Sequence, residues 1–263
     1  MDLKGKAAIV TGSGGGGCGR AIALRFAREG ATVIVSDIDV DGARETAQLI
    51  EAAGGHASVF PADVRDEHAI KALIDHAVQM FGGLAVLVNN ASDPHPGFDT
   101  PLDQWRQTLE TDFIGAALAT RLAIDALRRG GGGAVVNMGS ISALPHGRDR
   151  RLPAYDAAKA GLIRLTTGLA FLREEGIRVN CLAPGWIAAP QVGEYWESLT
   201  PEQRKANGVP SRLLQLEEIA QAVVRLATDE SLYGRVLVWD SEDMPRLIEW
   251  ADQGYAKTTS LDL

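Results

Sequence analysis

Cysteine is scarce in this chain of 263 residues, which has only Cys18 and Cys181. Two cysteines are too few for a disulfide framework, so we expect a protein of a reducing compartment, the cytoplasm. No N-terminal apolar signal region and no run of about 18 apolar residues is present, so we predict no membrane span. Positive charge is also in short supply, and the net charge of -8 argues against nucleic acid or an anionic membrane as the main partner.

Short apolar segments alternate with amphipathic helical patterns along most of the chain. The apolar segments predict strands over 6–11, 32–37, 57–62, 84–89, 134–138, 178–182 and 236–239. The helical patterns predict helices over 19–29, 41–53, 67–81, 102–129, 154–174 and 217–228. This alternation predicts one α/β domain over 1–263, a doubly wound, seven-stranded parallel sheet with helices on both faces.

A glycine-rich stretch, VTGSGGGGCGR over 10–20, joins the first predicted strand to the first predicted helix. Glycines let the backbone turn tightly against a pyrophosphate, and the following helix N-terminus supplies amide donors. A flexible glycine linker would not be flanked by a core strand and an amphipathic helix. The predicted dinucleotide contacts in this stretch are Gly12, Ser13, Gly14, Gly17, Cys18 and Gly19.

The second predicted strand ends in Asp37, followed by Ile38, and both are predicted cofactor contacts. Asp37 lies 18 residues beyond Gly19, near the offset of about 20 expected for a ribose-binding carboxylate. A carboxylate there accepts hydrogen bonds from the adenosine ribose hydroxyls and repels the 2′-phosphate of NADP. No arginine immediately follows it, so the sequence favours NAD.

Tyr155 and Lys159 are four residues apart and therefore share one face of a predicted helix. A free phenol, with a pKa near 10, is a poor proton donor or base at neutral pH without help. A nearby ammonium stabilises the phenolate and so prepares the phenol for proton transfer. Upstream, Ser140 ends the fifth predicted strand and follows Met138 and Gly139.

In this order and spacing, the glycine stretch, the strand-end residues and the Tyr-x-x-x-Lys pair resemble the short-chain dehydrogenase/reductase family of the classical type. The resemblance covers nearly the whole chain and implies a single-domain Rossmann fold. It also implies an NAD-dependent oxidoreductase that interconverts a secondary alcohol and a ketone by hydride transfer. By this resemblance Ser140 would hydrogen-bond the substrate oxygen, Tyr155 would transfer the proton, and Lys159 would hold the cofactor ribose.

The family's pattern assigns further cofactor contacts at the carboxyl ends of strands: Asp63, Val64, Asn90, Ala91, Met138, Pro184, Gly185 and Ile187. Among these, Asp63 would meet the amino group of adenine, and the segment 184–187 would lie beneath the nicotinamide. Trp186 in that segment would form an apolar wall of the substrate site. We predict no metal site.

Two serines compete for the catalytic position. Ser140 matches the family's local pattern at the strand end, whereas Ser142 matches its usual spacing before the tyrosine. We prefer Ser140, because the strand end fixes its position and the following loop can hold two extra residues at little entropic cost.

Asp112 departs from the family, which usually has asparagine at this point of the helix before the fifth strand. The main-chain carbonyl of that asparagine is thought to hold a water that links the lysine to solvent, and a backbone role survives substitution. A carboxylate near Lys159 would nevertheless change the protonation equilibrium of the site. Asp112 is therefore included among the predicted catalytic residues.

Two segments extend beyond a minimal domain. The excursion 188–212 is expected to cover the substrate as a lid, and the tail 244–263 to pack on a neighbouring subunit of a dimer or homotetramer. Three arginines, Arg148, Arg150 and Arg151, lie in the loop that rims the substrate side. They suggest an anionic group on the alcohol or ketone, although exposed arginines more often face water, and the apolar walls suit a ring-bearing alcohol equally well.

Two other functions remain open. A reductase of 3-oxoacyl-[acyl-carrier-protein] type would use NADPH, and Asp37 argues against it. A nucleotide-binding sensor could have kept the fold and lost turnover. The set of Ser140, Tyr155 and Lys159 argues against a sensor, while Asp112 leaves it some room.

Overall fold

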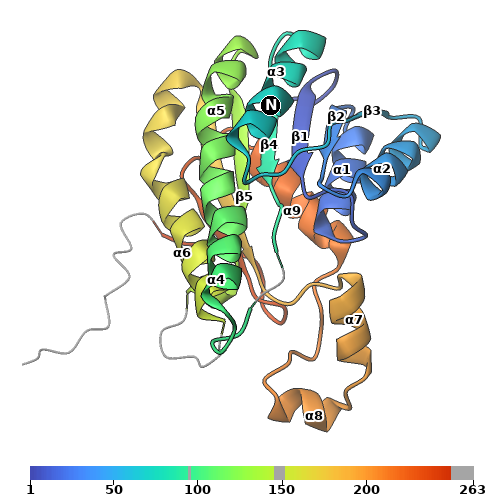
Figure 1. Cartoon of the computed structure of the whole chain (residues 1–263), viewed down its shortest axis with the longest axis vertical. Helices are drawn as coiled ribbons and strands as arrows, with labels where there is room; N and C mark the ends of the chain where they lie inside the picture. Colours follow the sequence, from blue (N-terminus) through green and yellow to red (C-terminus); the bar gives the residue numbers. More distant parts are fainter. Residues whose placement is uncertain (94–95, 145–151, 250–263) are drawn as a thin grey trace, which may run out of the picture.

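The structure, a computed structural model, describes residues 1–93, 96–144 and 152–249. Within these residues eight strands form one sheet in the order β3-β2-β1-β4-β5-β6-β7-β8 (Figure 1). The strands are β1 Ala7–Thr11, β2 Thr32–Ser36, β3 His56–Val59, β4 Val86–Asn89, β5 Gly133–Met138, β6 Ile177–Pro184, β7 Val236–Trp239 and β8 Arg246–Leu247. Neighbouring strands from β3 to β7 pair in parallel, and β8 pairs antiparallel with β7.

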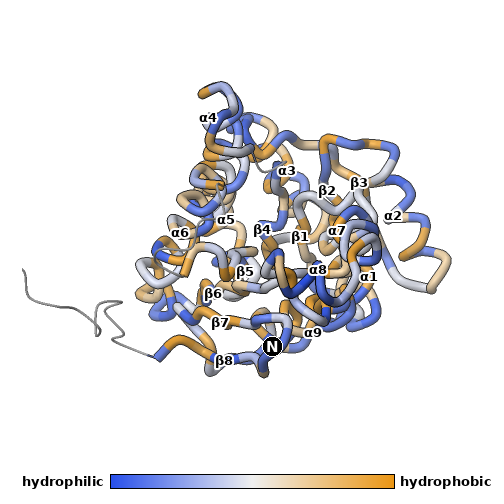
Figure 2. Tube along the Cα trace, turned by 90° about the horizontal axis from the view of Figure 1, so that it is seen from below, coloured by the Kyte–Doolittle hydropathy of each residue, from blue (hydrophilic) through white to orange (hydrophobic). Residues whose placement is uncertain are grey.

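Helices connect the strands and cover both faces of the sheet. They are α1 Cys18–Arg28, α2 Val40–Ala52, α3 Glu67–Phe81, α4 Leu102–Leu109, α5 Ala116–Arg129, α6 Pro153–Gly168, α7 Pro190–Glu197, α8 Pro201–Ala206 and α9 Leu216–Thr228. Seen from below in Figure 2, α5 and α6 lie on one side of the row of strands, and α1 and α9 lie on the other. The predicted parallel α/β sheet with helices on both faces is therefore confirmed.

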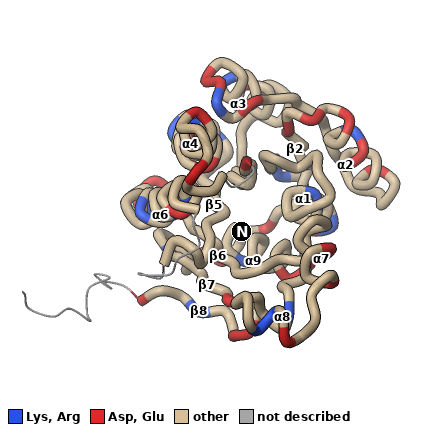
Figure 3. Tube along the Cα trace, turned by 60° about the horizontal axis from the view of Figure 1, so that its bottom comes forward, with Lys and Arg blue, Asp and Glu red and all other residues tan. Residues whose placement is uncertain are grey.

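Side chains alternate between the two faces of the sheet along each strand, and this alternation divides the core into two layers. On β1, Ala8 and Val10 pack in a cluster with Phe26 of α1, whereas Ile9 packs in a second cluster with Ile70 of α3. Successive side chains of a strand point to opposite faces, so a run of buried apolar residues needs a helix layer on each side. Charged residues lie mainly on the helices around the sheet, and the strands are almost free of them (Figure 3).

The short strand β8 lies at the start of the predicted tail 244–263, where no strand was predicted. It pairs Leu237 with Leu247 at the edge of the sheet. Two residues are too few for an alternating pattern to show, so sequence periodicity could not have found this strand. The rest of the tail from residue 250 lies outside the described residues.

The predicted helix over 102–129 is interrupted. Between α4 and α5 the structure has a π turn, Glu110–Gly115, in which Thr111, Asp112 and Gly115 are buried. Gly115 lies so close to the chain after β3 that a Cβ atom on it would be 2.7 Å from the carbonyl oxygen of Val64. π turns inside helices occur often at functional sites, and helical periodicity alone does not reveal them.

All parallel strands end at one edge of the sheet, below which α7 and α8 project (Figure 1). The chain passes from β1 outward to β3 and then returns to place β4 on the other side of β1. In open α/β sheets, ligands bind at such a switch point, outside the carboxyl ends of the strands. The order of strands therefore points to the edge beneath β1 and β4 as the ligand site.

Candidate active site

The glycine loop fits against the end of β4 only because it lacks side chains. Gly12 has a φ of +65°, and a Cβ atom on it would lie 2.6 Å from the Cα of Ala91. A Cβ on Gly19, inside α1, would lie 2.1 Å from the carbonyl oxygen of Gly12. In contrast, a Cβ on Gly15 would have no heavy atom within 4 Å.

Replacing Gly19 with alanine should destabilise the protein, although alanine is the better helix former. The helix preference gains at most about 1 kcal/mol, whereas the clash with a backbone oxygen is expected to cost about 2–3 kcal/mol or more. Chemical denaturation of Gly19→Ala should show this loss of unfolding free energy. Gly15→Ala is the matched control, since its methyl group enters open space. Equal stability of the two variants would contradict the described packing.

Side chains from β1 and β4 hold this loop in place. Asn90 donates from Nδ2 to the carbonyl oxygens of Thr11 and Gly12, both at 2.9 Å. The Thr11 hydroxyl donates to the carbonyl oxygen of Val88 and accepts from the amide of Ala91. Asn90 and Ala91, predicted as cofactor contacts, therefore also bind the glycine loop itself.

The amino end of α1 fits an anionic group. Its N-cap is Gly17, which has no side chain to bond the first amides, and the first turn has no acidic residue. Helix N-termini of this kind bind phosphate groups. Arg20 braces the loop by donating to the carbonyl oxygen of Gly14 at 2.9 Å and pairing with Glu45. Burial raises the pKa of the Cys18 thiol to about 11, so this residue carries no charge at neutral pH.

Ser13 contributes to the loop from inside the protein. Its side chain is fully buried and donates to the carbonyl oxygen of Val10 at 2.8 Å, and it accepts from the amide of Ser36. The hydroxyl is thus used to join the ends of β1 and β2. Its main-chain amide also donates to the carbonyl oxygen of Ser36 at 3.2 Å, and its carbonyl oxygen accepts from the hydroxyl of Thr46 at 2.8 Å, so Ser13 serves to hold the loop.

Asp37 lies half-buried just beyond β2, beside the glycine loop. One carboxylate oxygen accepts from the amide of Gly14 at 2.7 Å, and the other accepts from the amide of Asp39 at 2.9 Å. An ionised carboxylate can accept about four hydrogen bonds, so it retains capacity for two more. That capacity matches the two hydroxyls of a ribose, and with the glycine loop and the α1 terminus these residues fit a dinucleotide.

Asp63, after β3, is held by an arginine that sequence reasoning did not include. Arg65 forms a two-pronged contact with both carboxylate oxygens, with Nη2 at 2.6 Å from Oδ2. Arg65 lowers the pKa of Asp63 below its usual range. Both side chains are about one-third exposed, 35% each, so the pair is fixed in orientation without being sealed from a ligand.

The predicted catalytic residues come together where β5 ends and α6 begins. Ser140 is the second residue after β5, and its hydroxyl accepts from the amide of Ser142 at 3.1 Å. On α6, the Lys159 ammonium lies 5.4 Å from the centre of the Tyr155 ring and donates to the carbonyl oxygen of Met138 at 3.1 Å. Pro153 opens α6, a position where proline is well tolerated, and so fixes where the Tyr155 helix begins.

Asp112 reaches this cluster from the π turn. Its carboxylate lies 3.0 Å from the Lys159 ammonium, and the exposed fractions of the two side chains are 0% and 4%. The structure thus places a buried carboxylate beside the lysine, as the sequence indicated. The roles of Ser140, Tyr155, Lys159 and Asp112 remain predictions.

A chain of buried polar side chains supports the strands beneath the site, and sequence reasoning missed it. Asn89 donates to Asn137 at 2.8 Å, and Asn137 donates to Thr166 of α6 at 2.9 Å. Buried polar groups normally need such partners. The signal was present in the sequence, because Asn137 interrupts an otherwise apolar strand.

The predicted nicotinamide segment leaves β6 and is tied to the chain after β7. The amide of Gly185 donates to the carbonyl oxygen of Trp239 at 2.8 Å, and the amide of Trp186 donates to the hydroxyl of Ser241 at 2.8 Å. A Cβ on Gly185 would lie 2.8 Å from the same hydroxyl. These contacts fix the path of the segment 184–187 at the carboxyl edge of the sheet.

The predicted lid over 188–212 folds as a small unit of its own, built from α7 and α8. Trp196 donates to the carbonyl oxygen of Pro210 at 2.8 Å, and the Arg204 guanidinium lies 3.3 Å above its ring. The two ends of the lid are joined, because Leu214 donates to the carbonyl oxygen of Trp186 and accepts from the amide of Ala188, both at 2.8 Å.

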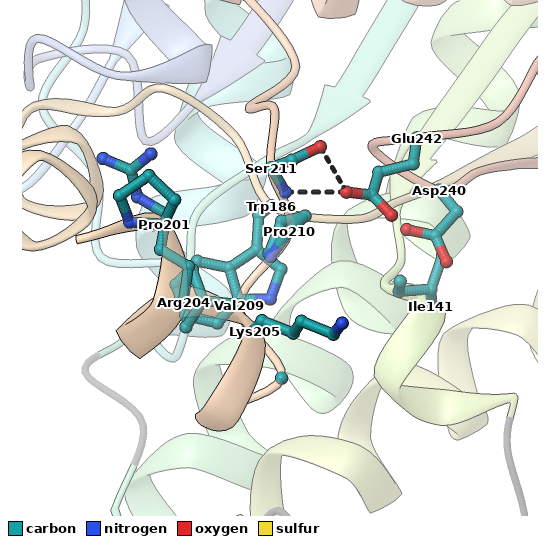
Figure 4. Close-up of a pocket in the computed structure, with 11 residues that line it drawn as sticks. Ile141, Trp186, Pro201, Arg204, Lys205, Val209, Pro210, Ser211, Asp240 and Glu242 are labelled. Atoms are coloured by element: carbon teal, nitrogen blue, oxygen red, sulfur yellow. Dashed lines mark hydrogen bonds between the residues drawn. The ribbon is translucent and has the colours of Figure 1, made fainter. Parts of the chain in front are cut away.

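A cavity of about 520 Å³ lies between the lid and the loops that leave β5, β6 and β7 (Figure 4). Ile141, next to Ser140, and Trp186 contribute apolar walls, and Val209 of the lid adds another. Four charged residues also line it: Arg204 and Lys205 of α8, and Asp240 and Glu242 after β7. The cavity thus has both apolar and charged walls and begins one residue beyond the predicted catalytic serine.

Comparison with known proteins agrees with this geometry. A family model described as enoyl-(acyl carrier protein) reductase matches residues 14–241. The chain belongs to the short-chain dehydrogenase/reductase family. Within this family it is 37% identical over 246 residues to 3beta-hydroxysteroid dehydrogenase 1 of Eggerthella lenta, which covers 88% of this chain and 90% of the relative. It is 32% identical over 232 residues to cyclohexanol dehydrogenase of an Acinetobacter species, with 87% and 90% covered.

Among solved structures of the family, a 7 alpha-hydroxysteroid dehydrogenase complexed with NADH and 7-oxo glycochenodeoxycholic acid matches with a TM-score of 0.81. The two sequences are 33% identical, and the match covers 90% of this chain and 93% of that one. Relatives of this kind and the family membership show an oxidoreductase that acts between an alcohol and a ketone. No helix within the described residues has the length and apolar character to cross a membrane.

Three arginines of the predicted substrate rim, Arg148, Arg150 and Arg151, lie outside the described residues. The hypothesis of an anionic substrate group therefore stays a prediction from the sequence.

Proposed function

We propose that this family member is an NAD-dependent dehydrogenase that interconverts a secondary alcohol on a saturated ring and the corresponding ketone. The observation that carries the proposal is the Lys159 ammonium, which lies beside the Tyr155 ring and binds the carbonyl oxygen of Met138 at the end of β5, two residues before Ser140. The ring-bearing substrate is supported by Trp186 and Ile141 in the cavity wall and by relatives named for hydroxysteroids and cyclohexanol.

The chain's own residues would divide the work at the substrate oxygen. NAD, when bound, would accept a hydride from the alcohol carbon or, once reduced, return one to the ketone carbon. The Tyr155 hydroxyl would exchange the proton at the oxygen, and the Ser140 hydroxyl would donate a hydrogen bond to the same oxygen. Lys159, held by Met138 and Asp112, would present its remaining N–H to the cofactor ribose.

An absorbance assay at the reduced nicotinamide band tests this function. The purified protein is given NAD or NADP with cyclohexanol, a 3-hydroxysteroid and an open-chain secondary alcohol of similar polarity. We expect turnover with NAD and a higher kcat/KM for the ring alcohols. A preference for NADPH and a 3-oxoacyl thioester would instead support the reductase alternative, and cofactor binding without any turnover would support a sensor.

Cofactor choice should depend on Asp37. We expect NAD to bind at least about tenfold more tightly than NADP, because a carboxylate and a 2′-phosphate repel each other by about 1–2 kcal/mol even when solvent screens them. Asp37→Ala should reduce the ratio of the NADP dissociation constant to the NAD dissociation constant, mainly by tightening NADP binding. Titration of protein fluorescence gives both dissociation constants.

Asp41→Ala is the matched control for this prediction. It removes the same charge from the start of α2, where the side chain of Asp41 is 91% exposed and pairs with Arg44. The ratio of the two dissociation constants should stay unchanged in this variant. Equal or tighter binding of NADP to the unmodified protein would contradict the assignment of Asp37.

A further inference from the structure

Asp112 and Lys159 form an ion pair that is sealed from solvent. The side chain of Asp112 is fully buried, that of Lys159 is 4% exposed, and the Nζ to Oδ1 distance is 3.0 Å. Within the described residues neither carboxylate oxygen of Asp112 accepts a well-aligned hydrogen bond. The carboxylate therefore depends on the ammonium alone for compensation, and the pair has a net charge of zero.

The donors of the lysine show how the pair is oriented. An ammonium has three N–H groups. One of them points to the carbonyl oxygen of Met138 at 3.1 Å, whereas the contact with Asp112 is an ion pair without hydrogen-bond alignment. Lys159 is thus held between the end of β5, through Met138, and the π turn, through Asp112. Its contact with the reaction runs through Lys159, which makes Asp112 a positioning residue.

The other ionisable groups near this pair do not replace its charges. On α6, Tyr155 precedes the half-buried Asp156. After β4, Asp93 accepts a hydrogen bond from the hydroxyl of Thr111, next to Asp112. On β6, burial raises the pKa of the Cys181 thiol to about 12, so Cys181 is neutral.

The negative charge on the exposed side of the π turn, at Glu110, is balanced by a different cation, Arg65. Glu110 of this turn is exposed, and Arg65 after β3 interacts with Asp63, Asp93 and Glu110. In the described part of the chain, Lys159 is accordingly the one cation in ion-pair contact with Asp112.

We propose that Asp112, by neutralising Lys159, keeps the Tyr155 hydroxyl protonated at neutral pH, in the form that gives a proton to a ketone. An unpaired ammonium would favour the phenolate, and a neutral pair favours it less. In reduction, the ketone carbon gains a hydride from the reduced nicotinamide and the ketone oxygen gains the proton of Tyr155, which solvent then replaces. Alcohol oxidation needs the phenolate as base and so requires a higher pH. This inference rests on the proposed dehydrogenase function.

Replacing Asp112 with asparagine, which has nearly the same shape, tests the proposal through the pH profile. In the unmodified enzyme kcat/KM for alcohol oxidation should rise with pH, with an apparent pKa that reports the ionisation of Tyr155. Asp112→Asn should move this rise to lower pH by about one unit, because the ammonium charge is no longer cancelled.

Glu110→Gln is the matched control, since it removes the same charge from the exposed side of the same π turn. The pH dependence of kcat/KM for this variant should coincide with that of the unmodified enzyme. A purely structural role of Asp112 would lower the melting temperature without moving the profile. A folded Asp112→Asn variant with an unshifted profile would overturn the proposal.

A second measurement needs neither turnover nor the Asp112 variant. Ultraviolet difference titration of the unmodified protein against Tyr155→Phe isolates the phenolate absorbance of Tyr155. We expect no phenolate signal at neutral pH, and a signal already present there would overturn the proposal. Because this titration uses no substrate, it can be read even if the assay shows no dehydrogenase activity.

Discussion

Tyr155→Phe should abolish turnover, by at least about a thousandfold, while leaving NAD binding nearly unchanged. The phenyl ring keeps the packing of the tyrosine and removes only the hydroxyl that would exchange a proton with the substrate. General acid–base groups contribute about 10²–10⁴-fold to rate, so this is the largest loss that we expect from a single atom. The measurement combines the nicotinamide absorbance assay with a fluorescence titration of NAD.

The Lys159 ammonium provides an internal check on Tyr155→Phe. It lies 5.4 Å from the centre of the ring and is bound by Met138 and Asp112, so loss of the hydroxyl leaves its own partners in place. A variant that binds NAD normally but has no activity supports the assignment. Retained activity above one-tenth would mean that another group transfers the proton.

Ser140→Ala should slow the reaction by about a hundredfold or more. The expected loss is about 2–3 kcal/mol of barrier, by analogy with removal of one donor to a developing oxyanion. Both Ser140 and Ser142 are 8% exposed, so burial does not separate the candidates. Their positions differ, because Ser140 lies two residues after β5 at the N-cap of the short helical turn Ile141–Ala143, whereas Ser142 lies inside this turn.

Ser142→Ala is the control for this choice of serine. The Ser142 hydroxyl is buried and has no hydrogen-bond partner among the described residues, so its removal should leave kcat within about threefold and change stability little. The two variants are compared by kcat at saturating NAD and substrate. A larger loss in Ser142→Ala would show that the spacing to Tyr155, rather than the strand end, identifies the catalytic serine.

The parts of the fold that follow from periodicity could be predicted from the sequence. Buried parallel strands such as β1 read as continuous apolar runs, and the polar residue that ends each run marks the edge where ligands bind. Asp37 was found in this way, and Asn90 and Ser140 by the family resemblance at the same kind of position; the structure places all three at that edge.

Features that depend on tertiary contacts could not be predicted. The π turn at Asp112 arises where the helix passes against Val64, and helical periodicity continues through it unchanged. Arg65 engages Asp63 through a local turn that no strand or helix pattern reports. The strand β8 depends on a partner, β7, rather than on a pattern of its own.

The joined ends of the lid have an evolutionary consequence. Leu214 binds Trp186 and Ala188 at the point where the lid leaves and rejoins the sheet. The residues between Ala188 and Leu214 therefore form a closed loop outside the sheet. An insertion or deletion within 190–210 would change this closed loop without altering the register of any strand. Lengthening a closed loop also costs little entropy. The lid can therefore diversify independently of the proton-transfer residues, so new substrates can arise by drift in this segment while the chemistry stays fixed.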